Sequence, residues 1–193
     1  DGAPDLGALC QKGTVVDLLQ LLGCGLNGTI PWELSLLSNL QLLAMDQNKG
    51  LRGSLPKELG KLSSLVQMTF DNSSLTGTLP TEFGPLTNLE GFSVISNTLS
   101  GTIPTEWVQW KRIRTFFLTE NDFTGTLPPE FGLLTTMEKF LVSNNNFVGP
   151  IPSEFGLWTN LTILSLNNNN FTGTLPTEVG ELTKLTRLFV YAN

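Results

Sequence analysis

Residues 161–176 read L-T-I-L-S-L-N-N-N-N-F-T-G-T-L-P, so that Leu161, Leu164, Leu166, Asn169 and Phe171 fit the pattern L-x-x-L-x-L-x-x-N-x-F. The same register begins again at Val16, Leu40, Leu65, Leu89, Ile113, Met137 and Leu185. The closing proline recurs with one step of 25 residues and five steps of 24, at Pro31, Pro56, Pro80, Pro104, Pro128, Pro152 and Pro176. A fixed period of this length predicts stacked structural repeats.

Each copy shows the alternation of a half-buried strand. Phe116 and Leu118, like Leu164 and Leu166, are two residues apart, and this spacing sends both side chains to one face. One repeat cannot bury that face alone, so neighbouring copies must stack. The prediction is an α/β repeat fold, a right-handed leucine-rich-repeat solenoid with a concave parallel β-sheet and short helical or 3-10 convex segments. Residues 14–193 would form about eight repeats, the last one truncated.

A polar column follows the predicted strands, comprising Cys24, Asn48, Ser73, Asn97, Asn121, Asn145, Asn169 and Asn193. The chain must turn sharply here, which leaves backbone N–H and C=O groups inside the solenoid. An Asn amide both donates and accepts, so a stack of them can satisfy those groups. We interpret the column as structural.

The segment after each proline predicts a short helical turn on the convex side. Proline suits its first position, and an aligned acidic residue suits the free N–H groups of a first turn, at Glu33, Glu58, Glu82, Glu106, Glu130, Glu154 and Glu178. Trp107, Trp110 and Trp158 are interpreted as core beneath these turns rather than as a ligand site. Glycines are expected to end the turns with positive φ, at Gly60, Gly84, Gly132, Gly156 and Gly180.

Composition excludes several functions. The chain has a net charge of −6, 11 Lys and Arg and no His, so it offers no basic surface for nucleic acid. Without His, no Ser–His or Cys–His nucleophile forms, and no phosphate loop, dinucleotide fingerprint or metal-ligand spacing occurs. We expect no enzyme activity, cofactor or metal here, and any catalytic domain, such as a kinase, would lie outside the chain. No apolar run is long enough to span a membrane.

The motif L-x-G-x-I-P, as in Leu26–Pro31 and Leu99–Pro104, resembles the plant-specific class of leucine-rich repeats over nearly all of residues 14–193. The form F-T-G-T-L-P-x-E-F-G also looks like repeats of diatom and other algal proteins. The resemblance implies a second short strand at the motif and a binding face on the concave sheet. That class includes receptor-like ectodomains, polygalacturonase-inhibiting proteins and ice-active plant proteins.

The resemblance also implies an N-terminal cap with paired cysteines, of which only Cys10 has a fitting position. Residues 1–13 would therefore be a remnant of that cap, and we expect both ends to be cut from a longer protein. A Cys10–Cys24 disulfide stays open, because two cysteines do not fix the redox compartment.

The first hypothesis is a non-catalytic scaffold, the extracellular recognition domain of a receptor-like or secreted protein, which binds a protein, peptide or glycan. Apolar and aromatic side chains exposed on a sheet are typical of such interaction surfaces. The predicted concave ligand-binding residues are Leu42, Thr115, Phe117, Thr119, Lys139, Leu141, Ile163, Arg187, Phe189 and Tyr191. Inhibition of a secreted hydrolase is a narrower form of this hypothesis.

An alternative uses the Thr-rich motif strands. A regular array of hydroxyl and methyl groups could order water and bind ice, or form a structural surface, through Thr76, Thr78, Thr102, Thr124, Thr126, Thr172 and Thr174. Arg52, Val148 and Pro150 interrupt this array, and Thr is also a common solvent-facing strand residue.

Extracellular or cell-surface location rests mainly on the resemblance. Four N-glycosylation sequons permit it, at Asn27, Asn72, Asn160 and Asn170, although about three would arise by chance. Neither the ligand nor the oligomeric state follows from the sequence.

Overall fold

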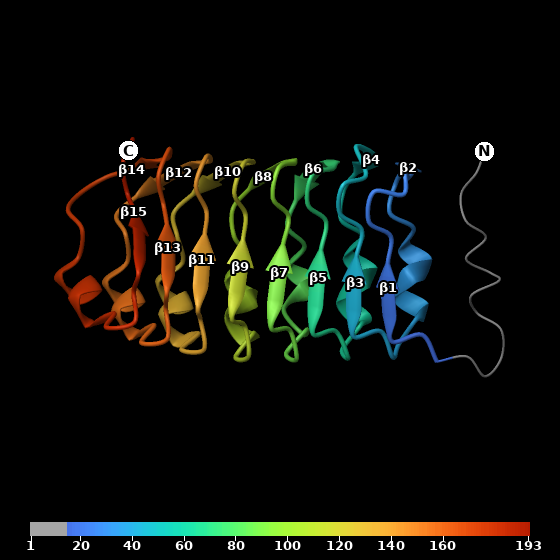
Figure 1. The fold of residues 1–193 in the computed structure, drawn as a ribbon, viewed down its shortest axis with the longest axis horizontal. Coiled ribbons are helices and arrows are strands. Elements are labelled where there is room, and N and C mark those ends of the chain that lie inside the picture. Colours follow the sequence, from blue (N-terminus) through green and yellow to red (C-terminus); the bar gives the residue numbers. More distant parts are fainter. Residues whose placement is uncertain (1–14) are drawn as a thin grey trace.

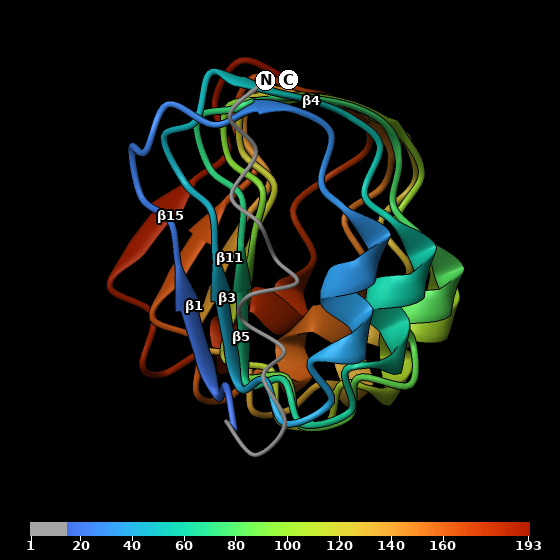
Figure 2. The same cartoon turned by 90° about the vertical axis from the view of Figure 1, so that its right-hand side faces the viewer.

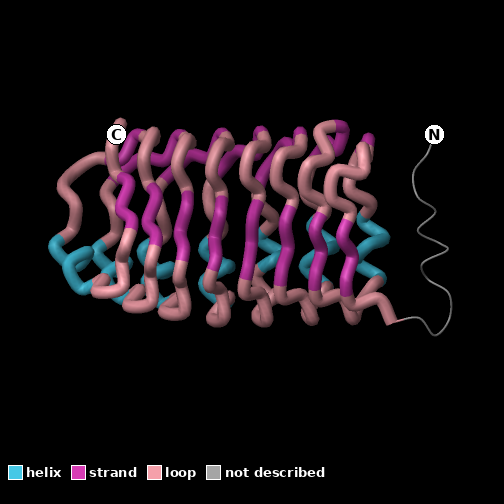
Figure 3. Tube along the Cα trace, viewed as in Figure 1, coloured by secondary structure: helices cyan, strands magenta, loops and turns pink. Residues whose placement is uncertain are grey.

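The structure is a computed structural model that describes residues 15–193, which stack along one axis into an elongated solenoid (Figure 1). Cys10 and the predicted cap remnant at residues 1–13 lie outside the described residues. Each of the first seven turns of the solenoid contains a strand, a second short strand and a 3-10 helix, in that order, and the eighth contains the strand alone (Figure 3). This arrangement confirms the leucine-rich-repeat solenoid expected from the 24-residue period.

The first strands of all turns form one parallel sheet of eight strands. Every strand is three residues long, and its register is set by the repeat: Lys139 pairs with Thr115 on one side and Ile163 on the other. The strands are β1 (Leu18–Gln20), β3 (Leu42–Ala44), β5 (Gln67–Thr69), β7 (Gly91–Ser93), β9 (Thr115–Phe117), β11 (Lys139–Leu141), β13 (Ile163–Ser165) and β15 (Arg187–Phe189).

The x-Gly-x motifs form a second parallel sheet of seven strands, as the resemblance implied. Its strands are β2 (Asn27–Gly28), β4 (Gly50–Gly53), β6 (Ser74–Thr78), β8 (Thr98–Gly101), β10 (Asp122–Gly125), β12 (Asn146–Gly149) and β14 (Asn170–Phe171). The third side consists of 3-10 helices, which lie across the core from the eight-stranded sheet (Figure 2). They are η2 (Trp32–Leu36), η3 (Lys57–Lys61), η4 (Thr81–Phe83), η5 (Thr105–Gln109), η6 (Pro129–Leu133), η7 (Ser153–Leu157) and η8 (Thr177–Glu181).

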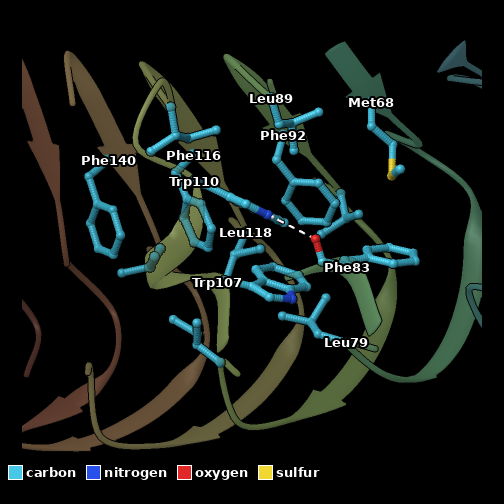
Figure 4. Close-up of a cluster of buried hydrophobic side chains, with 14 of the residues drawn as sticks. Met68, Leu79, Phe83, Leu89, Phe92, Trp107, Trp110, Phe116, Leu118 and Phe140 are labelled. Carbon is cyan, nitrogen blue, oxygen red and sulfur yellow. Dashed lines mark hydrogen bonds between the residues drawn. The ribbon is translucent and has the colours of Figure 1, made fainter. Parts of the chain in front are cut away.

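Aromatic side chains fill the middle of the core (Figure 4). Trp107 and Trp110 are fully buried and stack with ring centroids 4.2 Å apart, and Phe92 meets Trp107 edge-on at 5.1 Å. Both indole N–H groups are satisfied: Trp107 Nε1 donates to the Pro80 carbonyl at 3.0 Å and Trp110 Nε1 to the Phe83 carbonyl at 2.9 Å. The tryptophans are therefore core residues, as predicted, and they also tie η5 to the turn before it.

The Asn column is a buried hydrogen-bond ladder, which confirms its structural interpretation. Asn121 Nδ2 donates to Val94 O of the preceding turn at 2.8 Å and to Leu118 O of its own turn at 3.1 Å. Its Oδ1 accepts the Leu99 N–H at 3.0 Å. The same pattern recurs at Asn97, Asn145 and Asn169. Each amide thus joins two consecutive turns in the interior.

Two members of the column depart from this pattern. Cys24 is exposed rather than buried, so its predicted place inside the turn was wrong. Ser73 has a buried Oγ that finds no hydrogen-bond partner among residues 15–193. It follows the one 25-residue repeat, where the additional residue lets the Leu51 N–H reach Asn48 O at 2.8 Å. The Leu51 N–H is thus satisfied by a backbone carbonyl in a local turn, whereas the equivalent N–H of other repeats donates to an Asn side chain.

The expected role of the convex glycines was also wrong. None of Gly60, Gly84, Gly132, Gly156 and Gly180 has a positive φ. Four of them instead lie against the next 3-10 helix, and a Cβ on Gly60 would stand 2.0 Å from the Glu82 carbonyl oxygen. The side chain is excluded there by the closeness of neighbouring turns. The aligned glutamates, by contrast, do fall in the first turns of the 3-10 helices, as predicted.

Candidate ligand-binding face

The outer surface of the eight-stranded sheet, here called the sheet face, carries the first and third residues of every strand. The middle residues, such as Phe116 and Phe140, point into the core and are fully buried. Parallel pairing then places equivalent residues of successive turns side by side, at about 4.8 Å. The predicted residues Leu42, Thr115, Phe117, Lys139, Leu141 and Ile163 all lie on this face and are half-buried.

Phe117 on β9 and Leu141 on β11 are direct neighbours and form an apolar ridge across the sheet face. The residues in line with the ridge on either side are small: Ser93 on β7 and Ser165 on β13. Both hydroxyls are engaged within the protein, because Ser93 Oγ donates to Asp71 at 2.6 Å and Ser165 Oγ donates to Asn167 at 2.9 Å. The ridge is therefore bordered on both sides by small serine side chains whose hydroxyls already have hydrogen-bond partners within the protein.

Lys139 is the charged residue beside this ridge, on the same strand as Leu141. Its neighbours in the register are Thr115 and Ile163, neither of which carries a charge. Within residues 15–193, ion pairs are made by Arg114 alone, with Glu90 at 3.5 Å and Glu138 at 2.6 Å. The ammonium group of Lys139 thus has no carboxylate partner in the described part of the chain.

Thr119 follows Phe117 by two residues, beyond the end of β9, and its hydroxyl is 3.2 Å from that of Ser143. Arg187, Phe189 and Tyr191 lie in the last described turn and are exposed. Leu188, whose equivalents are buried in the preceding strands, is itself 37% exposed. The exposure of Phe189 and Tyr191 therefore does not distinguish a binding surface, and β9 and β11 carry the stronger argument.

Sequence reasoning did not identify a carboxylate pair on the sheet face. Asp46 accepts hydrogen bonds from the Thr69 hydroxyl at 2.8 Å and the Asp71 N–H at 2.7 Å. Asp71 in turn accepts the Ser93 hydroxyl and the Ile95 N–H, at 2.6 and 2.7 Å. The signal was present, since two Asp occupy one column in consecutive turns, but only the structure shows that each bridges to the turn after it.

Burial raises the pKa of the Asp71 carboxyl above its ordinary value of 3.8, and the neighbouring Asp46 adds to the rise. The hydrogen bonds from Ser93 and Ile95 lower the pKa and only partly offset burial. The folded protein consequently binds a proton here more readily than the unfolded chain. Between the ordinary and the raised pKa, stability contributed by this group rises as the pH falls.

Asp71→Asn should raise the melting temperature at pH 7, because it removes the buried charge and keeps an oxygen that accepts the same two hydrogen bonds. Melting temperatures of both proteins, measured by circular dichroism from pH 7 to pH 3, provide the check. The advantage of the variant should shrink as the wild-type carboxyl becomes protonated. A variant that melts below the wild type at pH 7 would contradict this account.

The Thr-rich strands form a separate surface on the seven-stranded sheet. The γ-methyl of each Thr lies over the glycine of the next turn: a Cβ on Gly101, Gly125 or Gly149 would stand 2.7–2.9 Å from Cγ2 of Thr78, Thr102 or Thr126. These glycines also have φ near +80°, so both the space and the backbone require glycine. The array is interrupted by exposed Val148 and Pro150. Thr76, Thr124, Thr172 and Thr174 are likewise exposed.

The four sequons lie away from the strands of the sheet face. Asn27 and Asn170 are in β2 and β14, Asn72 is in the turn after β5, and all three are exposed. Asn160 is half-buried, and its amide joins two turns by donating to Thr135 O at 3.3 Å and accepting from Lys184 Nζ at 2.8 Å. Of the four, Asn160 has its side chain most engaged in the fold.

Two general features complete the description of residues 15–193. No three His, Cys, Asp or Glu side chains of this part gather into a group suited to a metal ion. None of its helices has the length and apolar character needed to cross a membrane.

Comparison with known proteins agrees with the fold. Residues 160–182 match the family model described as Leucine Rich Repeat. No curated protein sequence matches the chain. The solved structure of a TDR receptor is 38% identical, with a TM-score of 0.82, over 84% of this chain and 28% of the receptor.

Two structures from Arabidopsis are similar as well. The ectodomain of the membrane receptor kinase GASSHO1/SCHENGEN3, in complex with CASPARIAN STRIP INTEGRITY FACTOR 2, is 30% identical with a TM-score of 0.85, over 90% of this chain and 24% of that one. The ectodomain of the receptor kinase HAESA, in complex with an IDA peptide hormone, is 32% identical with a TM-score of 0.81, over 84% and 27%. This chain spans about a quarter of the length of these receptors.

The two parallel sheets, the 3-10 side and the Asn ladder define a leucine-rich-repeat solenoid. With its L-x-G-x-I-P motif and these structural neighbours, the chain is a plant-type leucine-rich-repeat protein.

Proposed function

We propose that this chain is a non-catalytic recognition scaffold that binds a peptide or protein ligand on its sheet face, outside the cell. The observation that carries the proposal is the apolar ridge of Phe117 and Leu141, two large half-buried side chains that adjoin each other on the sheet face. Exposed aromatic and aliphatic side chains that adjoin one another are typical anchors of protein interfaces.

The structural neighbours support the same proposal. The HAESA ectodomain is solved with a peptide hormone ligand, and the GASSHO1/SCHENGEN3 ectodomain is solved with CASPARIAN STRIP INTEGRITY FACTOR 2. Both are receptor-kinase ectodomains, which favours an extracellular setting for this chain. None of the four sequons lies in the strands of the sheet face.

The alternative function, an ice-interacting face, would use the Thr-rich surface of the seven-stranded sheet, and it is less well supported than ligand binding on the sheet face. Its methyl groups are held in place by the glycines of the next turn, which gives a regular run from Thr78 to Thr126. Pro150 then replaces Thr in the column, and Val148 replaces it two residues earlier. Thr packing over glycine also has a structural purpose, because it covers backbone that would otherwise face solvent.

The experiment compares two variants in a pull-down from extracellular extract, with bound proteins identified by mass spectrometry. Phe117→Asp/Leu141→Asp places two carboxylates on the ridge. Leu133→Asp/Leu157→Asp makes the same chemical change on the 3-10 side, where the two leucines are 57% and 52% exposed. Both variants must retain the wild-type circular dichroism spectrum and cooperative melting.

We expect a partner that the wild type and the 3-10-side variant retain and that the ridge variant loses by at least about tenfold, since interface anchors contribute roughly 2 kcal/mol or more. A partner retained equally by both variants would place recognition elsewhere and refute the proposal. Loss of the partner only in the 3-10-side variant would do the same.

A further inference from the structure

We propose that the sheet face recognises an extended peptide in which an apolar side chain and an aspartate or glutamate stand two residues apart. The apolar side chain would pack on the ridge of Phe117 and Leu141, and the carboxylate would pair with the ammonium group of Lys139. The inference rests on the proposed function and adds the chemistry of the ligand.

The first argument is the state of Lys139. It is half-buried on the sheet face, between two uncharged register neighbours, and no carboxylate of residues 15–193 forms an ion pair with it. The nearest acidic residue in the sequence, Glu138, is already paired with Arg114 at 2.6 Å. A half-buried lysine without a carboxylate partner, beside apolar side chains, favours a ligand that supplies a negative charge.

The second argument is that Lys139 is the one charged residue in the four strands β7, β9, β11 and β13. The two serines in line with the ridge have engaged hydroxyls, because the Asp71 carboxylate accepts the Ser93 hydroxyl and the side-chain oxygen of Asn167 accepts the Ser165 hydroxyl. Lys139 is therefore the group of these strands that can select the charge of a ligand.

The third argument is spacing. Lys139 and Leu141 are the first and third residues of β11, so both project from the same side of the sheet. Two residues of a strand span about 6.6 Å, and two residues of an extended peptide span the same distance. A peptide that lies along β11 can therefore place an apolar side chain on the ridge and a carboxylate near Lys139, with one residue between them.

The test is selection from a random eight-residue peptide display library, with enrichment read by sequencing. The bait is the folded chain in five forms: wild type, Lys139→Gln, Lys139→Glu, Lys61→Gln and Phe117→Ala/Leu141→Ala. Lys61 is exposed in η3 on the opposite side, so its variant removes the same charge far from the ridge. The Ala pair shortens the ridge without adding negative charge that would itself repel acidic peptides.

We expect the wild type and Lys61→Gln to enrich the same motif, an apolar residue with Asp or Glu two places away on either side. Lys139→Gln should lose the acidic preference, and Lys139→Glu should replace it with a preference for Lys or Arg. A synthetic peptide with the most enriched sequence should bind Lys139→Gln about fivefold more weakly than wild type in fluorescence anisotropy, as for a partly exposed ion pair.

Several outcomes overturn the inference. One is a wild-type motif without acidic enrichment, and another is an acidic preference that survives in Lys139→Gln. A library from which the wild type enriches no motif overturns it as well. Peptides that depend on Phe117 and Leu141 but lack an acidic residue would refute this inference and leave the proposed function standing. Peptides retained equally by the Ala pair would refute both.

Discussion

Asn121→Ala should lower the free energy of unfolding by about 3 kcal/mol, because the substitution leaves several buried backbone groups without partners. Asn121 accepts the Leu99 N–H and donates to Val94 O and Leu118 O, and its own side chain is buried. Water cannot replace these bonds inside a packed turn. Urea denaturation followed by circular dichroism measures the loss.

Two other substitutions make this prediction specific. Asn146→Ala changes an exposed Asn on β12 and should alter stability by less than about 0.5 kcal/mol. Ser73→Ala, in the same column as Asn121, should be neutral or stabilising, because it removes a buried hydroxyl that has no partner among residues 15–193. If Ser73→Ala proved as costly as Asn121→Ala, the column would stabilise the fold by some means other than the hydrogen bonds seen here.

Gly60→Ala should be comparably damaging, at about 3 kcal/mol, because the new Cβ would stand 2.0 Å from the Glu82 carbonyl oxygen. The clash is with backbone, so the two adjacent 3-10 helices must move apart. The matched control is Gly180→Ala, at the equivalent position of η8, where nothing lies within 4 Å of the added atom. We expect that control to leave stability unchanged or slightly raised.

Thermal melting of the two glycine variants decides why glycine recurs in the 3-10 helices: because the backbone is left-handed there, or because the neighbouring turn approaches closely. If left-handed backbone were the reason for glycine, both substitutions would destabilise the protein. The structure has none of these glycines at positive φ, so only the one with a close neighbour should do so. Equal destabilisation by Gly60→Ala and Gly180→Ala would contradict the close-approach explanation.

These interior contacts bear on the proposed function because they hold the sheet face in register. The buried Asn ladder and the buried tryptophans bond to the turn before them, which keeps Phe117 next to Leu141 and Lys139 next to Thr115. A ligand on the sheet face therefore meets a surface whose shape is set before binding. Such pre-organisation reduces the ordering cost of association.

The sequence by itself determined the solenoid, its eight-stranded sheet and the faces of those strands. With a 24-residue period and alternating Leu and Phe, the apolar side chains are buried only if successive repeats stack. The Asn column follows from the sharp turn that each repeat must make. Lys139, Phe117 and Leu141 could therefore be placed on one surface without coordinates. The resemblance to plant-type repeats added the second strand, which alternation alone did not indicate.

The tertiary structure decided everything that depends on contacts between turns. Only the tertiary structure shows that Gly60 is needed because a neighbouring carbonyl approaches it. It also shows that the Ser73 hydroxyl finds no partner among residues 15–193, because the 25-residue repeat forms a local turn, and that the Asp71 carboxyl is half-buried beside Asp46. A repeat pattern specifies which residues recur but not how closely one turn approaches the next. Those distances arise from packing of the whole stack, and they determine which side chains are strained, satisfied or free to meet a ligand.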